Sequence, residues 1–279
     1  MTGAWWEYLM VFSGTALLCT VLTPAAMRFA VSRNFLDHPG GHKSHDTAVP
    51  YLGGIAIIGA FAAAVLVVSI LQPPHSGQGE LLLVLVASLL MAMVGLVDDL
   101  KHVSPLWRVV AEIAAAVLVW SLGSGVTVTT VEALNLGLTI LWFVGITNAF
   151  NLLDNMDGLA AGIAAISSLT IFAIAATNGQ FLIAALAVGL AGCAAGFLRY
   201  NFHPARIYMG DGGALFIGFL VAYLGIKLRL EGDRGVSALV PVLACSMAVF
   251  DTTLVSISRL ATGRSPFQGG RDHVSHRLV

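Results

Sequence analysis

Long apolar runs separated by short polar segments dominate this chain. A spanning helix needs about 20 mostly apolar residues, and nine stretches approach or exceed that length. They are 6–27, 52–72, 80–97, 105–122, 133–150, 158–177, 180–198, 212–230 and 236–259. The fourth and fifth are the least sharply separated, whereas Q-P-P-H-S-G-Q-G after the second is a strong turn signal. The pattern predicts an all-α, polytopic transmembrane helix bundle of about nine spans.

Composition supports the same class of protein. Hydrophobic residues make up 57% of the 279 residues and charged residues only 10%, whereas soluble domains carry about 25% charged residues. No tandem repeat or low-complexity linker divides the chain, so residues 1–279 are interpreted as one membrane domain. Three cysteines lie in apolar runs without zinc or disulfide spacing, which indicates small buried side chains.

Positive charge predicts the orientation. With the N-terminus outside, the inner segments hold eleven of the 14 lysines and arginines, which the positive-inside rule favours. They are Arg28, Arg33, Lys43, Lys101, Arg108, Arg199, Arg206, Arg259, Arg264, Arg271 and Arg277. The polar motifs fall on the same side, so an active site on the cytoplasmic face is expected. A transporter, the rival from another class, would place ionisable groups along several helices through the membrane.

The motif V-D-D-L (97–100) ends the third predicted span. Its adjacent carboxylates, Asp98 and Asp99, repel each other unless a cation or a proton intervenes. Such a pair could hold Mg²⁺ or act as a general base. A solvated helix end is the alternative interpretation.

The segment N-A-F-N-L-L-D-N-M-D-G follows the fifth apolar run. Asn148, Asn151, Asp154 and Asp157 recur at every third position, which on a helix keeps them on roughly one face. Carboxylate and amide oxygens suit Mg²⁺, which prefers hard oxygen ligands. Helix capping by Asp154 or Asn155 is the alternative, although a cap needs only one such residue.

The motif M-G-D-G-G (209–213) opens the eighth predicted span. Glycine allows close approach of the backbone to a ligand, Asp211 can present a carboxylate, and the free N–H groups of a helix start favour anions. The GK[ST] ending of a Walker A loop is absent. A glycine turn with an aspartate cap is the alternative.

The C-terminal motif R-D-H-V-S-H-R (271–277) groups two arginines and two histidines, which suits a phosphate-bearing substrate. A basic patch on anionic lipid is the alternative. Two acids fall inside predicted spans, where ionisable groups are suspected of function. Asp251 precedes Arg259 by two turns and is expected beneath the site, whereas Glu112 follows Arg108 by four residues and is expected to pair with it.

Five motifs in order carry a family resemblance. They are K-S-H-D-T-A-V-P-Y-L-G-G, V-D-D, N-A-F-N-L-L-D-N-M-D-G-L, Y-M-G-D-G-G and R-D-H-V-S-H-R-L. From about Asp37 to its last residue, the chain resembles the polyprenyl-phosphate N-acetylhexosamine-1-phosphate transferases, glycosyltransferase family 4. This resemblance implies Mg²⁺-dependent (alternatively Mn²⁺-dependent) transfer of a sugar-1-phosphate from a UDP-N-acetylhexosamine to a polyprenyl phosphate, with release of UMP.

The resemblance also implies roles for residues. Asp98 would be the base or positioning group for the lipid phosphate, with Asp99 beside it, and Asp211 and Asn151 would hold the metal. The nucleotide site would be lined by Asp154, Asp157, Asn201 and Tyr208. The sugar-phosphate end would be held by Arg271, His273, His276 and Arg277. Further candidates are Asn148, Lys43, His45 and Asp251.

The ending H-V-S-H-R-L resembles the GlcNAc-type branch, and transfer of phospho-N-acetylmuramoyl-pentapeptide is the alternative. Lys101 and His102 stand where the acidic motif of the family often continues to a third charged residue, aspartate or lysine, and Asn155 stands where the family usually has a glycine. The resemblance further implies the bacterial inner membrane, membrane lipids and a homodimer as partners, no nucleic acid, and additional helices after Val279. A CDP-alcohol phosphatidyltransferase is a second rival, but D-G-L-A-A-G at Asp157 lacks the arginine and acids of that chemistry.

Overall fold

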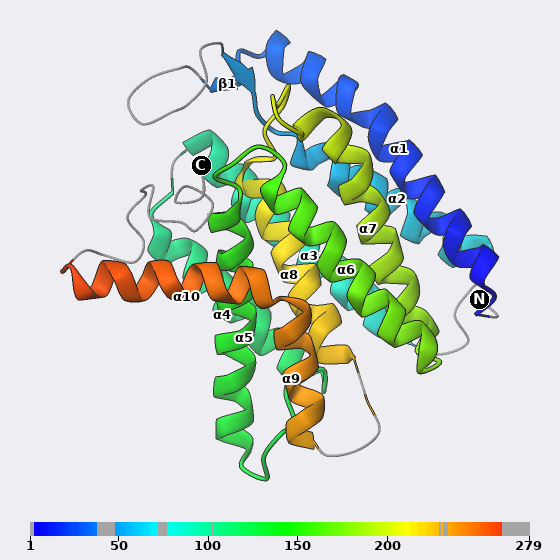
Figure 1. The fold of residues 1–279 in the computed structure, drawn as a ribbon, viewed down its shortest axis with the longest axis vertical. Helices are drawn as coiled ribbons and strands as arrows, with labels where there is room; N and C mark the ends of the chain where they lie inside the picture. Colours follow the sequence, from blue (N-terminus) through cyan, green and yellow to red (C-terminus); the bar gives the residue numbers. More distant parts are fainter. Residues whose placement is uncertain are drawn as a thin grey trace.

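The computed structural model describes residues 3–37, 48–71, 77–101, 103–228, 230 and 234–263, and these form a helical bundle (Figure 1). Two short strands, β1 (Leu36–Asp37) and β2 (Val49–Pro50), pair antiparallel between the first two helices. The helices are α1 (Trp5–Ser32), α2 (Gly54–Leu71), α3 (Gln78–Lys101), α4 (Pro105–Ser121), α5 (Glu132–Leu153), α6 (Leu159–Thr177), α7 (Phe181–Asn201), α8 (Gly210–Lys227), α9 (Arg234–Ala244) and α10 (Ser246–Ala261).

The structure confirms helices at the first eight predicted spans, with boundaries that differ by a few residues. Six described helices are long and apolar enough to cross a membrane, and α2 and α4 are shorter. The ninth predicted span, 236–259, is not one straight helix. That segment breaks at Cys245 into α9 and α10, which are bent by 77° and could together form a seventh span. Apolar character alone cannot distinguish a straight span from a bent one.

The core lies around α8, which is buried along almost its whole length. This helix packs chiefly against α3 and α5, and α1 lies at the outside of the bundle against α7, which is itself largely buried (Figure 1). Successive helices from α1 to α8 run in alternating directions. One end of the bundle, here called the polar end, therefore collects the C-termini of α1, α3, α5 and α7 and the N-termini of α2, α4, α6 and α8. Three of the predicted polar motifs meet there.

Glycines allow close backbone contact at the polar end. A Cβ at Gly95 of α3 would lie 2.3 Å from the carbonyl oxygen of Asp211 on α8. A Cβ at Gly54 of α2 would lie 2.4 Å from the backbone of Gly213. The backbone N–H groups of Gly53 and Gly54 donate to the carbonyl oxygens of Tyr208 and Met209. The start of α8 is thus held directly against two neighbouring helices.

Gly95→Ala is expected to destabilise the protein, because the added methyl group would force α3 and α8 apart. Overpacking of this kind costs about 1–3 kcal/mol. Thermal unfolding of the purified protein in detergent measures the effect. Gly14→Ala in α1 is the matched control, because a Cβ there meets no atom within 4 Å. Equal midpoints for the two variants would contradict the close approach of α3 and α8.

Candidate active site

The last turn of α3 is joined to the first turn of α8 through Asp99. One carboxylate oxygen of Asp99 accepts the N–H of Asp211 at 2.9 Å, and the other accepts the N–H of Gly212 at 3.1 Å. Both donors are free N–H groups of the helix start, where negative charge is favourable. Gly210, with φ of 78°, brings the backbone so close that a Cβ would lie 2.9 Å from Asp99. Asp99 therefore positions Asp211.

A single guanidinium nitrogen lies between two carboxylates from different helices. Nη1 of Arg108, at the start of α4, is 2.7 Å from Oδ2 of Asp98 and 3.2 Å from Oδ2 of Asp211. Asp98 is buried, and its other oxygen accepts the N–H of Val103 at 2.6 Å. Asn151 of α5 donates its amide N–H to Oδ1 of Asp211 at 2.6 Å. The centre of the site is thus an Asp98–Arg108–Asp211–Asn151 chain.

The polar ladder of the sequence divides among different partners. The amide of Asn148 donates to Glu112 on α4 and to the carbonyl oxygen of Val144. The expected Arg108–Glu112 pair is therefore a wrong prediction for this structure, because Arg108 is attracted to two carboxylates outside its own helix. Asp157, after the end of α5, accepts the N–H of Ala205 and contacts the ring of His203, both at 2.9 Å.

Asp154 is the C-cap residue of α5, close enough to Asp211 and Asp99 for their charges to act on its carboxyl group. Burial and the negative charge of Asp211 raise the pKa of its carboxyl group well above the usual 3.8, although the N–H of Gly210 acts in the opposite direction. Negative charge at this place is thus disfavoured unless a cation compensates it. Among the described residues, Arg108 is the one lysine or arginine in an ion pair with this group of carboxylates.

Asp154→Asn is expected to raise the midpoint of thermal unfolding at pH 7 in cation-free detergent solution. A carboxyl group with a raised pKa in the folded state contributes stability below its unfolded pKa of 3.8, and loses it as the pH rises through the folded pKa. Asparagine cannot ionise, so the advantage of the variant should disappear toward about pH 4. An advantage that is the same at both pH values would contradict the raised pKa.

Asn201 joins the two loops that border the site. Its side chain is buried, its Oδ1 accepts the N–H of Gly158 at 3.1 Å, and its Nδ2 donates to the carbonyl oxygen of Ile207 at 3.0 Å. Its amide is thus used within the protein, and a nucleotide contact stays a prediction. Tyr208 is half-buried nearby, and burial together with the charges of Asp157, Asp37 and Asp154 raises its pKa to about 12. Its phenol is neutral at physiological pH.

The side-chain oxygens at the centre suit a Mg²⁺ ion that takes its remaining ligands from the substrate and from water. No three His, Cys, Asp or Glu side chains converge on a metal position within the described ranges. Mg²⁺ commonly takes one or two carboxylates and completes its octahedron with water and phosphate oxygens. Asp211 is the best placed carboxylate, because its side chain is 33% exposed, whereas that of Asp98 is 8% exposed. Asn151 now contributes its nitrogen, so a metal contact through its oxygen stays a prediction.

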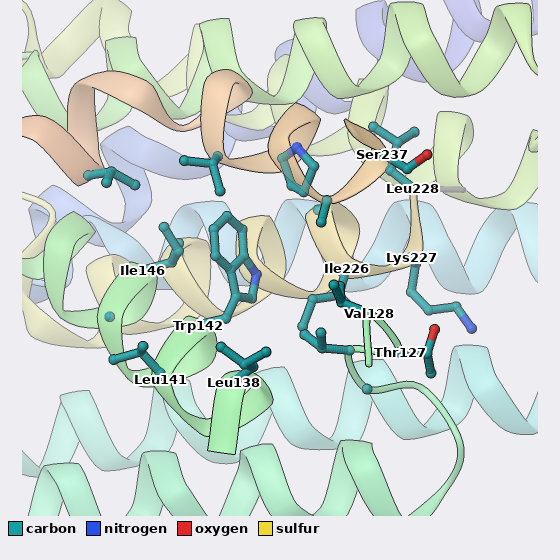
Figure 2. Close-up of a pocket in the computed structure, with 18 of the residues that line it drawn as sticks. Thr127, Val128, Leu138, Leu141, Trp142, Ile146, Ile226, Lys227, Leu228 and Ser237 are labelled. Atoms are coloured by element: carbon teal, nitrogen blue, oxygen red, sulfur yellow. The ribbon is translucent and has the colours of Figure 1, made fainter. Parts of the chain in front are cut away.

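An apolar cavity of about 900 Å³ lies against α5, α8, α9 and α10 (Figure 2). Much of its α5 wall consists of Leu138, Leu141, Trp142 and Ile146. Lys227, the last residue of α8, also lines the cavity, whereas Asp211 lies in the first turn of that helix. Ala149, two residues before Asn151, also belongs to the lining. From Leu138 to Ala149 the cavity follows about 17 Å of α5, at 1.5 Å per residue, and it approaches the polar end.

Several predicted residues lie elsewhere. Asp251 is buried in the second turn of α10, a helix that begins at Ser246 and ends at Ala261. Six other candidates fall outside the described residues, namely Lys43, His45, Arg271, His273, His276 and Arg277. Sequence reasoning missed the central position of Arg108 and the contact of His203 with Asp157. For Arg108, the available signal was a cation ten residues after Asp98, just past the proline that starts α4.

Comparison with known proteins gives consistent matches. The family model described as Glycosyl transferase family 4 matches residues 81–229. A Bacillus subtilis protein named "Probable undecaprenyl-phosphate N-acetylglucosaminyl 1-phosphate transferase" is 32% identical over 97% of this chain and 76% of its own length. A Mycobacterium tuberculosis decaprenyl-phosphate N-acetylglucosaminephosphotransferase is 33% identical over 95% and 74%. A Heliobacterium modesticaldum phospho-N-acetylmuramoyl-pentapeptide-transferase is 31% identical over 90% and 80%.

Proposed function

Because the chain belongs to glycosyl transferase family 4, we propose that it transfers N-acetylglucosamine-1-phosphate from UDP-N-acetylglucosamine to undecaprenyl phosphate. The products are undecaprenyl-diphospho-N-acetylglucosamine and UMP, for synthesis of a cell-envelope polysaccharide. The polar end faces the cytoplasm of a bacterial inner membrane in this proposal. The observation that carries it is the convergence of Asp98, Arg108, Asp211 and Asn151, together with a long apolar cavity whose α5 lining extends to Ala149.

In the proposed reaction, a phosphate oxygen of the lipid attacks the β-phosphorus of the UDP-sugar. A new P–O bond forms there, and the bond to the oxygen shared with the α-phosphate breaks, so that UMP leaves with the electron pair. Two anions must meet, which makes charge compensation the main requirement. Arg108 supplies one positive charge between Asp98 and Asp211. Mg²⁺ held by Asp211 would further reduce repulsion between the phosphates and stabilise the charge on the transferred group.

The protein's own groups define distinct roles in this proposal. Both oxygens of Asp98 are engaged, by Arg108 and by the N–H of Val103. This favours a role in positioning the guanidinium rather than in accepting a proton. Asp99 fixes the start of α8, and with it the carboxylate of Asp211. The apolar cavity along α5 suits part of the prenyl chain, because it is lined mainly by hydrocarbon side chains and its α5 lining extends to Ala149, two residues before Asn151.

Phospho-N-acetylmuramoyl-pentapeptide transfer is the second candidate, and the Heliobacterium match favours it. Release of UMP distinguishes the two donors. Purified protein in detergent is supplied with undecaprenyl phosphate, Mg²⁺ and either UDP-N-acetylglucosamine or UDP-N-acetylmuramoyl-pentapeptide. We expect UMP only with the first donor, and only when lipid and Mg²⁺ are both present. Release with the second donor alone would assign the other reaction, and no release with either donor would contradict the proposal.

A further inference from the structure

Glu112 is a buried acid that the proposed reaction does not yet use. It lies on α4, one helical turn after Arg108, and only 2% of its surface is exposed. One of its carboxylate oxygens accepts the amide N–H of Asn148. The other, Oε1, is buried and has no hydrogen-bond partner in the part of the chain that the structure describes. A buried acceptor without a partner is unfavourable, and such exceptions call for an explanation.

Arg108 competes with any cation for Asp211. Its Nη1 lies 3.2 Å from Oδ2 of Asp211, while Oδ1 of the same carboxylate accepts the amide of Asn151. Both oxygens of Asp211 are therefore in use in this structure. A divalent cation at Asp211 would bring a second positive charge close to the guanidinium. Repulsion by that cation would offset the attraction of the guanidinium to Asp211, although Asp98 at 2.7 Å would still attract it. A further negative charge nearby would compensate the weakened attraction.

Glu112 can supply such a position without movement of the backbone. Residues four apart on a helix have Cβ atoms about 5–6 Å from each other and lie on the same face. An arginine side chain covers that distance by a change of rotamer. The opposite face of α4 is exposed at Leu106 and Trp107, so Arg108 is confined to the side that faces the carboxylates. Glu112 also faces the bundle interior, because its carboxylate accepts the amide N–H of Asn148 on α5.

We propose that Glu112 is the alternative partner of Arg108, and that the guanidinium moves between the Asp98–Asp211 pair and Glu112 according to whether Asp211 holds a divalent cation. Glu112 is thereby a positioning residue. In the cation-bound state it compensates the positive charge of Arg108, and it thereby leaves Asp211 available to bind the cation. The inference rests on the cation site of the proposed function. It explains how Arg108 can remain close to that site when a cation is bound.

The test is a double-mutant cycle on cation affinity, with no turnover involved. Mn²⁺ binding to the full chain in detergent is followed by electron paramagnetic resonance, without substrate, for the native protein, Glu112→Gln, Arg108→Gln and the double variant. Glutamine keeps an oxygen for Asn148 but loses the charge. We expect Glu112→Gln to weaken binding about tenfold, equivalent to about 1.4 kcal/mol. In the Arg108→Gln background, which should bind Mn²⁺ more tightly than the native protein, Glu112→Gln should have little effect.

Two further measurements separate the possible failures. Glu112→Asp keeps the charge and should recover most of the affinity, and the thermal midpoint of each variant without cation shows that it is folded at the assay temperature. An equal loss in both backgrounds would reveal a general electrostatic effect, and no loss in either would reveal a structural acid. Each of these results overturns the exchange. Native Mn²⁺ binding that is unchanged by Asp211→Asn would instead overturn the proposed cation site itself.

Discussion

Asp211→Asn is expected to reduce the rate of UMP release by about 10²–10³-fold, the loss typical for removal of one preorganised electrostatic group. Among the residues that the structure describes, Asp211 is the one carboxylate that contacts both Arg108 and Asn151, and the backbone at its position is fixed by Asp99. Asparagine has nearly the same shape but no charge. The variant should therefore fold, yet lack the negative charge that holds a cation. The measurement is UMP release with saturating UDP-N-acetylglucosamine and undecaprenyl phosphate.

Glu132→Gln is the matched control for that loss. Glu132 is an exposed acid in the first turn of α5, at the opposite end of the bundle, and its neutralisation should leave the rate unchanged. The thermal midpoint of Asp211→Asn should be close to, or above, that of the native protein, because one of several crowded negative charges is removed. An Asp211→Asn enzyme with native turnover would show that the carboxylate cluster is not the reaction centre.

Arg108→Gln is expected to lower both stability and turnover. Without the guanidinium, Asp98 and Asp211 are left in a partly buried place without their cation, and loss of one partner from a buried ion pair costs about 3–5 kcal/mol. Exposure of 17% of the Arg108 side chain and 33% of the Asp211 side chain reduces this figure, so we expect about 2–3 kcal/mol. Turnover should fall by about 10²-fold at a temperature where the variant is folded.

Arg108→Lys tests whether charge alone is sufficient. A lysine retains the positive charge, but its side chain is shorter, so the ammonium is not expected to reach the position of Nη1 between Asp98 and Asp211. We expect intermediate stability and turnover, measured by thermal unfolding and UMP release. Arg199→Gln, at an exposed position in the last turn of α7, is the control and should change neither quantity. Native behaviour of Arg108→Gln would contradict the central place of this arginine.

The class of protein and the position of its polar end follow from local patterns. Apolar runs of about 20 residues can satisfy their backbone groups in lipid only as helices, and eight of the nine predicted segments are helical within a few residues. Because consecutive helices alternate in direction, polar motifs spaced one helix pair apart return to the same end of the bundle. The joint position of Asp98, Asn151 and Asp211 could therefore be predicted from the order of the helices.

The pairing of individual side chains could not be predicted in the same way. Arg108 and Glu112 have the spacing of a helical ion pair, yet Arg108 contacts Asp98 and Asp211, and Glu112 contacts Asn148. Which residues pair depends on the distances between helices. Glycines such as Gly95 shorten those distances, because they have no side chain to hold the neighbouring helix away. The bend between α9 and α10 could not be predicted from the sequence either, because an apolar segment is compatible with a straight or a broken helix.

The sequence by itself determined a membrane-embedded helical bundle with acids, amides and glycines gathered at one end, because hydrophobic length and loop polarity are properties of consecutive residues. Tertiary structure alone decided which acid faces which cation. It makes Asp99 a cap for α8, Asn201 a link between loops, and Asp211 the carboxylate shared by Arg108 and Asn151. The physical reason is that Coulombic and hydrogen-bond energies depend steeply on separations set by packing between distant segments.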